Sequence, residues 1–202
     1  MLTTKEAIEK RRSIRKFKPD PIPEEHILAI LDSARLAPSG SNSQPWRFKI
    51  VRDQETRSAL AQASHKQSFI AEAPIVLVCC VDIEGFLNGT VSGAQDLGRI
   101  GAVEGRIVKI IVDRTERYTP MDIEQITPRI AFNLAIAIEH IVLRALDFGL
   151  GTCWIRLFDE KAIKNIFGWG EHIHVVTLLP IGYPAESPAP RRRSSIEEIL
   201  ID

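Results

Sequence analysis

The chain has 202 residues, of which 45% are apolar and 26% charged, ordinary values for one soluble globular domain. Its 26 Lys and Arg residues balance its 26 Asp and Glu residues. A neutral total excludes a global attraction to nucleic acid or to a membrane surface, so local clusters must provide any anion binding. The sequence contains no run of 18 uncharged apolar residues, so we predict no membrane-spanning helix. We therefore expect no nucleic-acid partner and no membrane partner.

The three cysteines point to a reducing compartment. Cys79 and Cys80 are adjacent in an apolar run, where strand geometry directs them to opposite faces, and Cys153 stands alone. There is no C-x-x-C motif for zinc or redox chemistry. The segment 1–6 lacks the hydrophobic core of a secretion signal. These observations predict a cytoplasmic protein.

The first half of the chain alternates helix and strand signals. Thr3 and Glu6 form a capping-box pattern that opens a short helix. A second helix starts at Pro23 and ends before Pro38, with apolar residues on one face. Period-two alternation predicts a half-buried strand over 46–51, followed by a helix over 53–63. The apolar run 75–81 predicts a strand covered on both faces.

The second half begins with a stretch, 85–127, that has no clean period. Thr127 as cap and Pro128 in the first turn then predict a long helix to about residue 148. Its broad apolar stripe marks it as the core helix; the stripe is Ile130, Leu134, Ile138, Ile141, Val142 and Ala145. A short helix capped by Asp159 and a strand over 174–181 follow. Apolar residues in 196–201 give the tail something to pack against. One α+β domain over 1–202 accounts for this order.

Two basic clusters could bind phosphate. Arg11, Arg12, Ser13 and Arg15 combine guanidinium forks with a hydroxyl, a set that matches a phosphate group. Arg191–Arg193 could supply further contacts. The alternative for the first cluster is a solvated charged face, and for the second a disordered basic tail.

Two other segments could contact a flat ligand. The polar loop 38–46 could grip the edge of a heterocycle, or be an ordinary surface turn. In the segment 149–154, Gly149 and Gly151 would let the backbone approach a ligand, or simply end a helix. The segment does not match G-x-G-x-x-G, which excludes a Rossmann interpretation.

Other chemistries find little support. His172 and His174 form an H-x-H pair without a third ligand at supporting spacing, so we predict no metal site. Neither a G-x-S-x-G motif nor a P-loop is present. No acid–base pair stands out either, which is compatible with chemistry carried by a cofactor. We therefore assign no catalytic side chain.

Taken in order, these segments resemble the nitroreductase family. Arg11–Arg15 is similar to its R-R-S-x-R signature, and Ala37–Trp46 to its A-P-S-x-x-N-x-Q-P-W signature. Ala73–Val76 resembles its next strand, and Gly149–Ile155 its G-L-G-[ST]-C-W-I segment. The end of the chain, from Gly182 through the basic residues to Glu198, resembles its C-terminal pattern. The resemblance runs from residue 5 to 200 and excludes 85–127, where the family carries much of its substrate pocket.

The resemblance implies an α+β sandwich with a mainly antiparallel sheet flanked by helices, in an intertwined homodimer with FMN at the subunit interface. It implies that Arg11, Arg12 and Ser13 hold the phosphate and ribityl chain, with Arg15 at the flavin N1–C2 edge. Further FMN contacts would come from Pro38, Ser39, Ser41 and Asn42 of the other subunit, and from Gln67, Leu150, Gly151, Arg191 and Arg193. Leu150 and Gly151 would act near flavin N5 through their backbones.

The implied activity is hydride transfer from NAD(P)H through FMN to a small oxidised acceptor, such as a nitroaromatic or a quinone, by a ping-pong mechanism. Within the same family, a free-flavin reductase or a reductive dehalogenase is the alternative. Outside it, the chain could be a flavin carrier or sensor without turnover, or a small-molecule binding domain without flavin.

Overall fold

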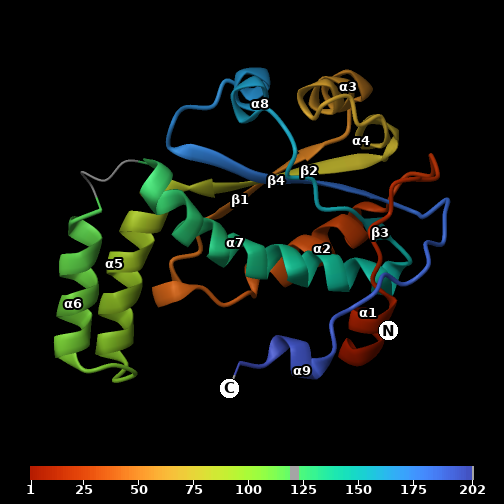
Figure 1. Ribbon diagram of the computed structural model, residues 1–202. Helices are drawn as coiled ribbons and strands as arrows, with labels where there is room; N and C mark the ends of the chain where they lie inside the picture. Colours follow the sequence, from red (N-terminus) through yellow and green to blue (C-terminus); the bar gives the residue numbers. More distant parts are fainter. Residues whose placement is uncertain (119–122, 202) are drawn as a thin grey trace.

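The computed structural model describes residues 1–118 and 123–201, and in this part of the chain the core is an antiparallel sheet of four strands (Figure 1). The strands are β1 (Trp46–Val51), β2 (Ile75–Asp82), β3 (Gly151–Thr152) and β4 (Ile173–Gly182). Their spatial order is β1-β2-β4-β3. The expected α+β fold with an antiparallel sheet flanked by helices is confirmed.

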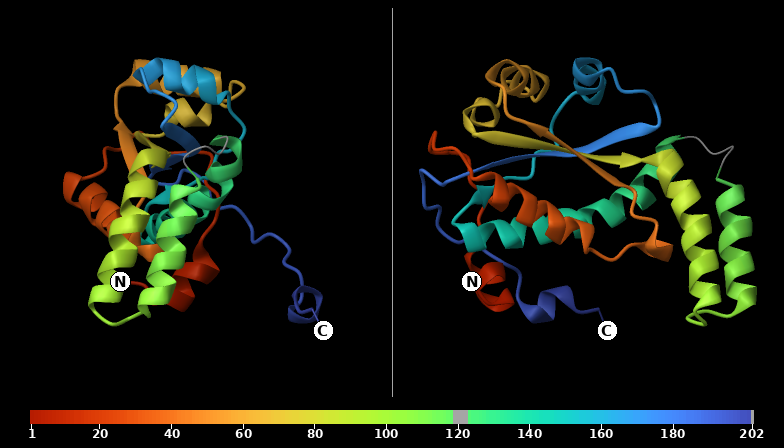
Figure 2. Two further views of the ribbon diagram at one scale, coloured as in Figure 1. Left: turned by 90° about the vertical axis from the view of Figure 1, so that its left-hand side faces the viewer. Right: turned by 180° about the vertical axis from the view of Figure 1, so that it is seen from behind.

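Helices cover both faces of this sheet (Figures 1 and 2). On one face lie α2 (Glu24–Arg35) and α7 (Ile123–Ala145), and on the other lie α3 (Gln54–Ala63), α4 (Phe69–Glu72) and α8 (Glu160–Phe167). β2 is buried along almost its whole length, as its apolar run predicts. Cys79 belongs to the cluster on the α7 side and Cys80 to the cluster on the α8 side, which confirms their opposite orientation.

The caps that the sequence indicates are present. Thr3 forms a capping box with Glu6 at the start of α1 (Thr4–Lys10), and Asp53 accepts a hydrogen bond from the Thr56 amide at 2.8 Å. Asp159 caps α8 in the same way, accepting from the Ala162 amide at 3.0 Å. Short polar side chains satisfy the free amides at helix starts, which is why these positions could be identified in advance.

The start of the core helix was predicted wrongly. α7 begins at Ile123, so Pro128 lies inside the helix instead of in its first turn. Pro128 has no N–H for the usual bond to the fourth preceding residue, a loss that packing of the helix offsets. The predicted apolar stripe is confirmed, since all six residues are buried. Gln125–Phe148 is long and apolar enough to cross a membrane. Burial of this stripe in the core accounts for its apolar composition.

An antiparallel pair of helices occupies most of residues 85–118, where no element was predicted. α5 (Ile83–Arg99) and α6 (Gly105–Glu116) pack together and project from one end of the sheet (Figures 1 and 2). Gly85, Gly89, Gly93 and Gly98 interrupt the apolar pattern of α5, and glycine normally weakens a helix. Tertiary packing outweighs that low propensity here.

The end of the chain leaves the body of the domain. After residue 186 it forms an arm that carries α9 (Ile196–Ile199), and both views in Figure 2 show α9 away from the sheet. Ile196, Ile199 and Leu200 are 63–67% exposed. The arm therefore holds these apolar side chains away from the core of its own domain.

Candidate functional site

The N-terminal basic cluster lies beside the glycine segment that follows α7. Ser13 forms a parallel bridge with Thr152, and the Ile14 amide donates to the Thr152 carbonyl at 2.9 Å. A Cβ atom on Gly151 would lie 2.5 Å from the Ile14 Cγ1 atom, so only glycine allows this approach. Two motifs separated by about 140 residues in the sequence thus become neighbours.

The segment before the C-terminal arm completes this arrangement. The Lys18 amide donates to the Tyr183 carbonyl at 2.8 Å, and the Ala185 amide donates to the Lys16 carbonyl at 2.9 Å. The Glu186 carboxylate accepts from the backbone amides of Arg15 and Lys16. These bonds fix the position from which the arm leaves, next to the basic cluster.

Together these segments form a pocket of about 350 Å³, which we call the arginine pocket. Its polar lining consists of six of the predicted site residues, namely Arg11, Arg12, Ser13, Arg15, Arg191 and Arg193. Arg192 is not part of the lining. Among the described residues, none of these arginines forms a salt bridge with a carboxylate. Five guanidinium groups without ion pairs favour an anionic ligand.

Two groups in this region have unusual environments: the Arg12 guanidinium lacks one hydrogen-bond partner in the part of the chain that the structure describes, and the Glu139 carboxyl has a raised pKa. Arg12 Nη1 donates to the carbonyls of Glu9 and Arg11 at 2.7 Å, whereas its buried Nε atom has no partner among the described residues. Burial raises the pKa of Glu139, although the charge of Arg11 opposes the shift. A buried donor without a partner is uncommon in native proteins and is satisfied when a ligand supplies an acceptor.

The polar loop lies far from the arginine pocket of its own chain. The Gly40 amide donates to Asn133 Oδ1 at 2.9 Å in the first half of α7, whereas the arginine pocket adjoins the segment after the end of α7 (Figure 1). Ser41, Asn42 and Gln44 have φ angles of 50°, 53° and 45°. This left-handed conformation is uncommon outside glycine, and such strain concentrates at ligand-binding loops.

Two of the other predicted contacts, Leu150 and Gln67, already have partners within the chain. The Leu150 side chain is 1% exposed and its amide donates to the Ala145 carbonyl at 3.0 Å, so neither group is free. The Gln67 side-chain amide donates to the carbonyls of Ser64 and Leu157 at 3.0 and 3.3 Å, outside the lining of the arginine pocket. Gly151 lies in β3 beside the basic cluster.

A further pocket of about 490 Å³ adjoins the polar loop and was missed by the sequence analysis. Its lining combines Gly40 and Ser41 with residues of α5, α6 and α7 and with Tyr118, which follows α6. The unclear pattern of 85–127 concealed these helices. Glycines at every fourth position, Gly85, Gly89 and Gly93, were an available signal, because they mark a helix face that admits close packing.

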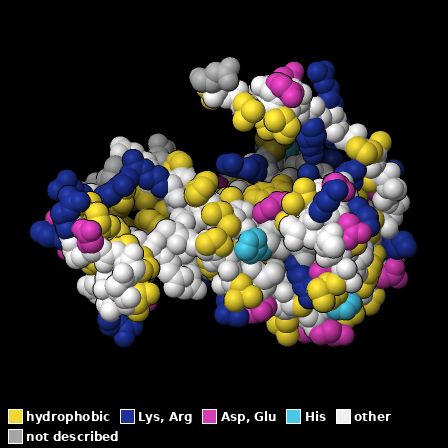
Figure 3. Space-filling view, turned by 90° about the horizontal axis from the view of Figure 1, so that it is seen from below, with side chains coloured by type: hydrophobic (Ala, Val, Ile, Leu, Met, Phe, Trp, Pro, Cys, Tyr) yellow, Lys and Arg dark blue, Asp and Glu magenta, His cyan; other side chains and the backbone are white. Residues whose placement is uncertain are grey.

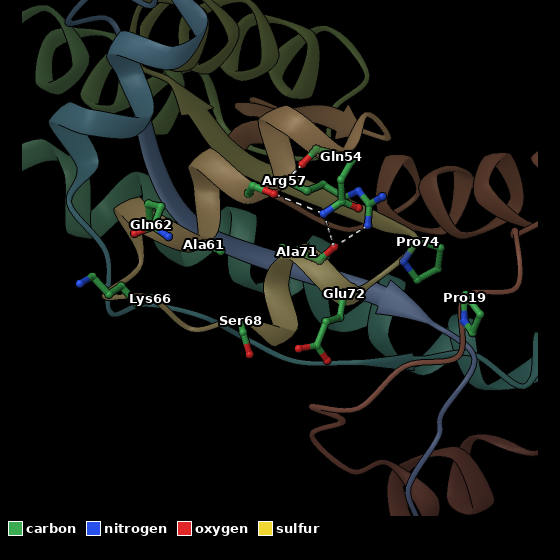
Figure 4. A pocket seen from close by; sticks show the side chains of 11 residues that line it. Pro19, Gln54, Arg57, Ala61, Gln62, Lys66, Ser68, Ala71, Glu72 and Pro74 are labelled. Atoms are coloured by element: carbon green, nitrogen blue, oxygen red, sulfur yellow. Dashed lines mark hydrogen bonds between the residues drawn. The ribbon is translucent and has the colours of Figure 1, made fainter.

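A pocket between α3 and α4 contains Arg57, whose guanidinium group is already bound to backbone carbonyls (Figure 4). Arg57 points from α3 toward the end of α4 and donates to the carbonyls of Ala71 and Ala73. These bonds satisfy the free carbonyls at a helix end. Arg57 thus has a structural role, and we assign no ligand here.

Thiol and metal chemistry are not supported by the described residues. Burial raises the pKa of Cys80 to about 12 and the pKa of Cys79 well above its usual range. Both thiols therefore stay protonated and are poor nucleophiles. His174 Nδ1 lies 2.9 Å from Glu160 Oε1, and no group of three His, Cys, Asp or Glu side chains could hold a metal in the part of the chain that the structure describes.

Comparisons with known proteins identify the family of this chain. Residues 8–183 match the model of the nitroreductase family. An NADH dehydrogenase of Thermus thermophilus is 33% identical over the whole chain and 96% of its own length. The NADPH:FMN oxidoreductase of Vibrio harveyi, solved with NAD⁺, superposes with a TM-score of 0.77 at 24% identity, over 98% of this chain and 76% of that one.

A further solved structure, from Exiguobacterium sibiricum, is described as a nitroreductase in complex with FMN. It has a TM-score of 0.81 at 22% identity and covers all of this chain and 97% of its own. At 22% identity this likeness shows a shared fold. The family itself is shown by the family model, which matches most of the chain, and by the Thermus relative, which matches all of it. The chain therefore belongs to the nitroreductase family.

Proposed function

We propose that this protein is an FMN-dependent oxidoreductase that takes hydride from NAD(P)H and passes it to a small oxidised acceptor. The observation that carries the proposal is the arginine pocket, in which two distant parts of the chain place unpaired guanidinium groups together. Relatives named NADH dehydrogenase and NADPH:FMN oxidoreductase support it.

The residues of the arginine pocket fit the phosphate end of FMN. Arg11, Arg12 and Ser13 offer a hydroxyl and guanidinium donors, including the unsatisfied Arg12 Nε atom. Arg191 and Arg193 approach from the arm. Arg15 is our candidate for the N1–C2 edge of the flavin, where a guanidinium favours negative charge on the ring. Gln67, Leu150 and Gly151 remain candidate flavin contacts from the family pattern.

We further propose that the working unit is a homodimer with FMN at its interface. Pro38, Ser39, Ser41 and Asn42 belong to a loop that is bound near the middle of α7, whereas the arginine pocket adjoins the segment after the end of α7. This separation within one chain favours a second copy that brings its loop to the pocket. The arm supports this, because α9 exposes apolar side chains that a partner would cover. Exposed apolar side chains also occur over the face seen in Figure 3. Ile8, Leu36 and Phe132 are among the exposed large apolar residues of the described chain.

FMN, when bound, supplies the hydride-accepting and hydride-donating chemistry. The chain itself binds the phosphate and orients the ring. A ping-pong scheme, in which nicotinamide leaves before the acceptor arrives, requires only one substrate pocket. We place the protein in the cytoplasm, where its three unpaired thiols would stay reduced.

The absorbance spectrum of the purified protein tests the cofactor. We expect a yellow protein that releases FMN, and not FAD, on denaturation. A colourless protein that gains no flavin absorbance on addition of FMN would contradict the proposal. Light scattering that finds a monomer with FMN fully bound would contradict the dimer.

Turnover distinguishes the alternatives. Steady NAD(P)H consumption with an added quinone supports the oxidoreductase, whereas a flavin carrier or sensor would be reduced at most once per site. Release of reduced free flavin or of halide would identify a flavin reductase or a reductive dehalogenase of the same family.

A further inference from the structure

The pocket beside the polar loop, which we call the Tyr118 pocket, has a mixed lining of a kind that suits a specific ligand. Phe86 of α5 and Ile126 and Phe132 of α7 supply apolar surface, while arginines of α6 and α7 lie around it. Figure 3 shows Lys and Arg side chains gathered around a hollow with a hydrophobic floor at the α5–α6 end of the molecule. An apolar cavity with a few converging polar groups is the usual form of a small-molecule site.

Two arginines from different helices converge on one phenol in this pocket. Arg114 Nε and Arg129 Nη1 each donate to the Tyr118 Oη atom at 2.7 Å, and both guanidinium groups also lie over the Tyr118 ring. Tyr118 is 9% exposed. A neutral phenol does not neutralise two cations, and neither arginine forms a salt bridge with a carboxylate of the described residues.

Thr90 supplies a second, independent sign of a ligand. It lies on α5 and lines the same pocket, and it is 8% exposed. Its buried Oγ1 atom has no hydrogen-bond partner among the described residues. An unsatisfied buried hydroxyl is costly unless a ligand completes its hydrogen bonds.

We propose that the Tyr118 pocket binds the acceptor substrate, and that this substrate is an aromatic anion whose carboxylate or similar group is held by Arg114 and Arg129. The aromatic ring lies against Phe86 and Phe132, and a polar substituent reaches Thr90. The volume of about 490 Å³ suits a molecule of one or two rings. This inference rests on the proposed function, because Gly40 and Ser41, which line the pocket, belong to the loop proposed to contact FMN.

Calorimetric binding to the purified FMN-loaded dimer tests the charge preference. The probes are 4-nitrobenzoate and 4-nitrobenzamide, which have almost the same shape but differ by one charge. We expect the anion to bind more tightly, and Arg129→Gln or Arg114→Gln to weaken it about tenfold, the effect of losing one charge-assisted hydrogen bond. The amide should bind the variants and the parent protein equally.

Two further variants separate this effect from general electrostatics. Arg106→Gln removes the same charge from α6 at a residue that does not line the pocket, and should leave both affinities unchanged. Arg129→Lys keeps the charge and should restore part of the lost affinity. Equal affinity of the parent protein for both probes, or an equal loss in Arg106→Gln, would overturn the inference.

A third probe, adenosine 2′,5′-bisphosphate, distinguishes an acceptor from the phosphate of a dinucleotide. Binding of this probe without binding of 4-nitrobenzoate would overturn the acceptor assignment. If the protein takes up no FMN but still selects the nitrobenzoate through Arg129, the proposed function fails while the anion site stands. If FMN binds and the selectivity is absent, only the anion site fails.

Discussion

The backbone carbonyl oxygen of Ser41 lies 1.6 Å from the point that a Cβ atom on Gly93 would occupy. Gly89, one helical turn earlier, stands in the same relation to the Ser43 carbonyl, at 2.5 Å. The polar loop therefore rests directly on a glycine face of α5. Ser41 and Asn42 of this loop have left-handed backbone conformations, and Ser41 also lines the Tyr118 pocket.

Gly93→Ala should displace the polar loop. The added methyl group would overlap a backbone carbonyl, and overpacking of this kind costs about 1–3 kcal/mol of unfolding free energy. We expect lower stability in urea unfolding and weaker FMN binding. Gly105→Ala is the control, because a Cβ atom there meets nothing within 4 Å and should leave FMN binding unchanged.

The three consecutive arginines of the arm should differ in their effect on FMN affinity. Arg191 and Arg193 line the arginine pocket and Arg192 does not. Arg191→Ala and Arg193→Ala should each weaken FMN binding about tenfold, as expected for loss of a charge-assisted hydrogen bond to phosphate. Arg192→Ala serves as the matched control in a flavin fluorescence titration. A loss of affinity as large in Arg192→Ala would show that only the net charge of the arm matters.

Glu160 should contribute stability that disappears in acid. Burial acts to raise its pKa, but hydrogen bonds from His174 and the Val175 amide outweigh burial, so its pKa is lowered from 4.5. Its contribution is therefore complete above about pH 4.5 and is lost as the pH falls through the lower folded-state pKa. We expect Glu160→Gln to be less stable at pH 7 and to lose less stability on acidification, measured by urea unfolding.

Glu139 should behave in the opposite sense. Burial raises its pKa above 4.5, so the folded state holds this proton more tightly than the unfolded state. Ionisation of Glu139 therefore costs stability as the pH rises through this range. Without flavin, Glu139→Gln should be more stable than the parent protein at pH 7, and the difference should vanish well below pH 4.5. A constant difference across this range would contradict the assignment.

The arm should be a determinant of dimerisation. Ile199 is 63% exposed, so Ile199→Asp should leave the fold of one subunit intact. If α9 packs on a partner, losing a buried isoleucine should raise the dimer dissociation constant at least about tenfold. Sedimentation at several concentrations measures this. Leu157→Asp is the control, since Leu157 is 65% exposed but adjoins α8 on the other face of the sheet.

The sequence by itself determined the elements whose signals are local. Caps at Thr3, Asp53 and Asp159 act within three residues, and a period of two or 3.6 residues follows directly from strand and helix geometry. The family motifs are likewise short and contiguous, so the arginine and loop residues could be named before their positions in space were known.

Only the tertiary structure decided the features that depend on distant contacts. The glycines of α5 would weaken this helix in isolation. Gly93 is nevertheless required, because a Cβ atom at this position would overlap the Ser41 carbonyl oxygen. Similarly, Arg129 of α7 reaches the hydroxyl of Tyr118, to which Arg114 of α6 also donates. Separation in sequence conceals such a cluster, because no local pattern records which helices will become neighbours.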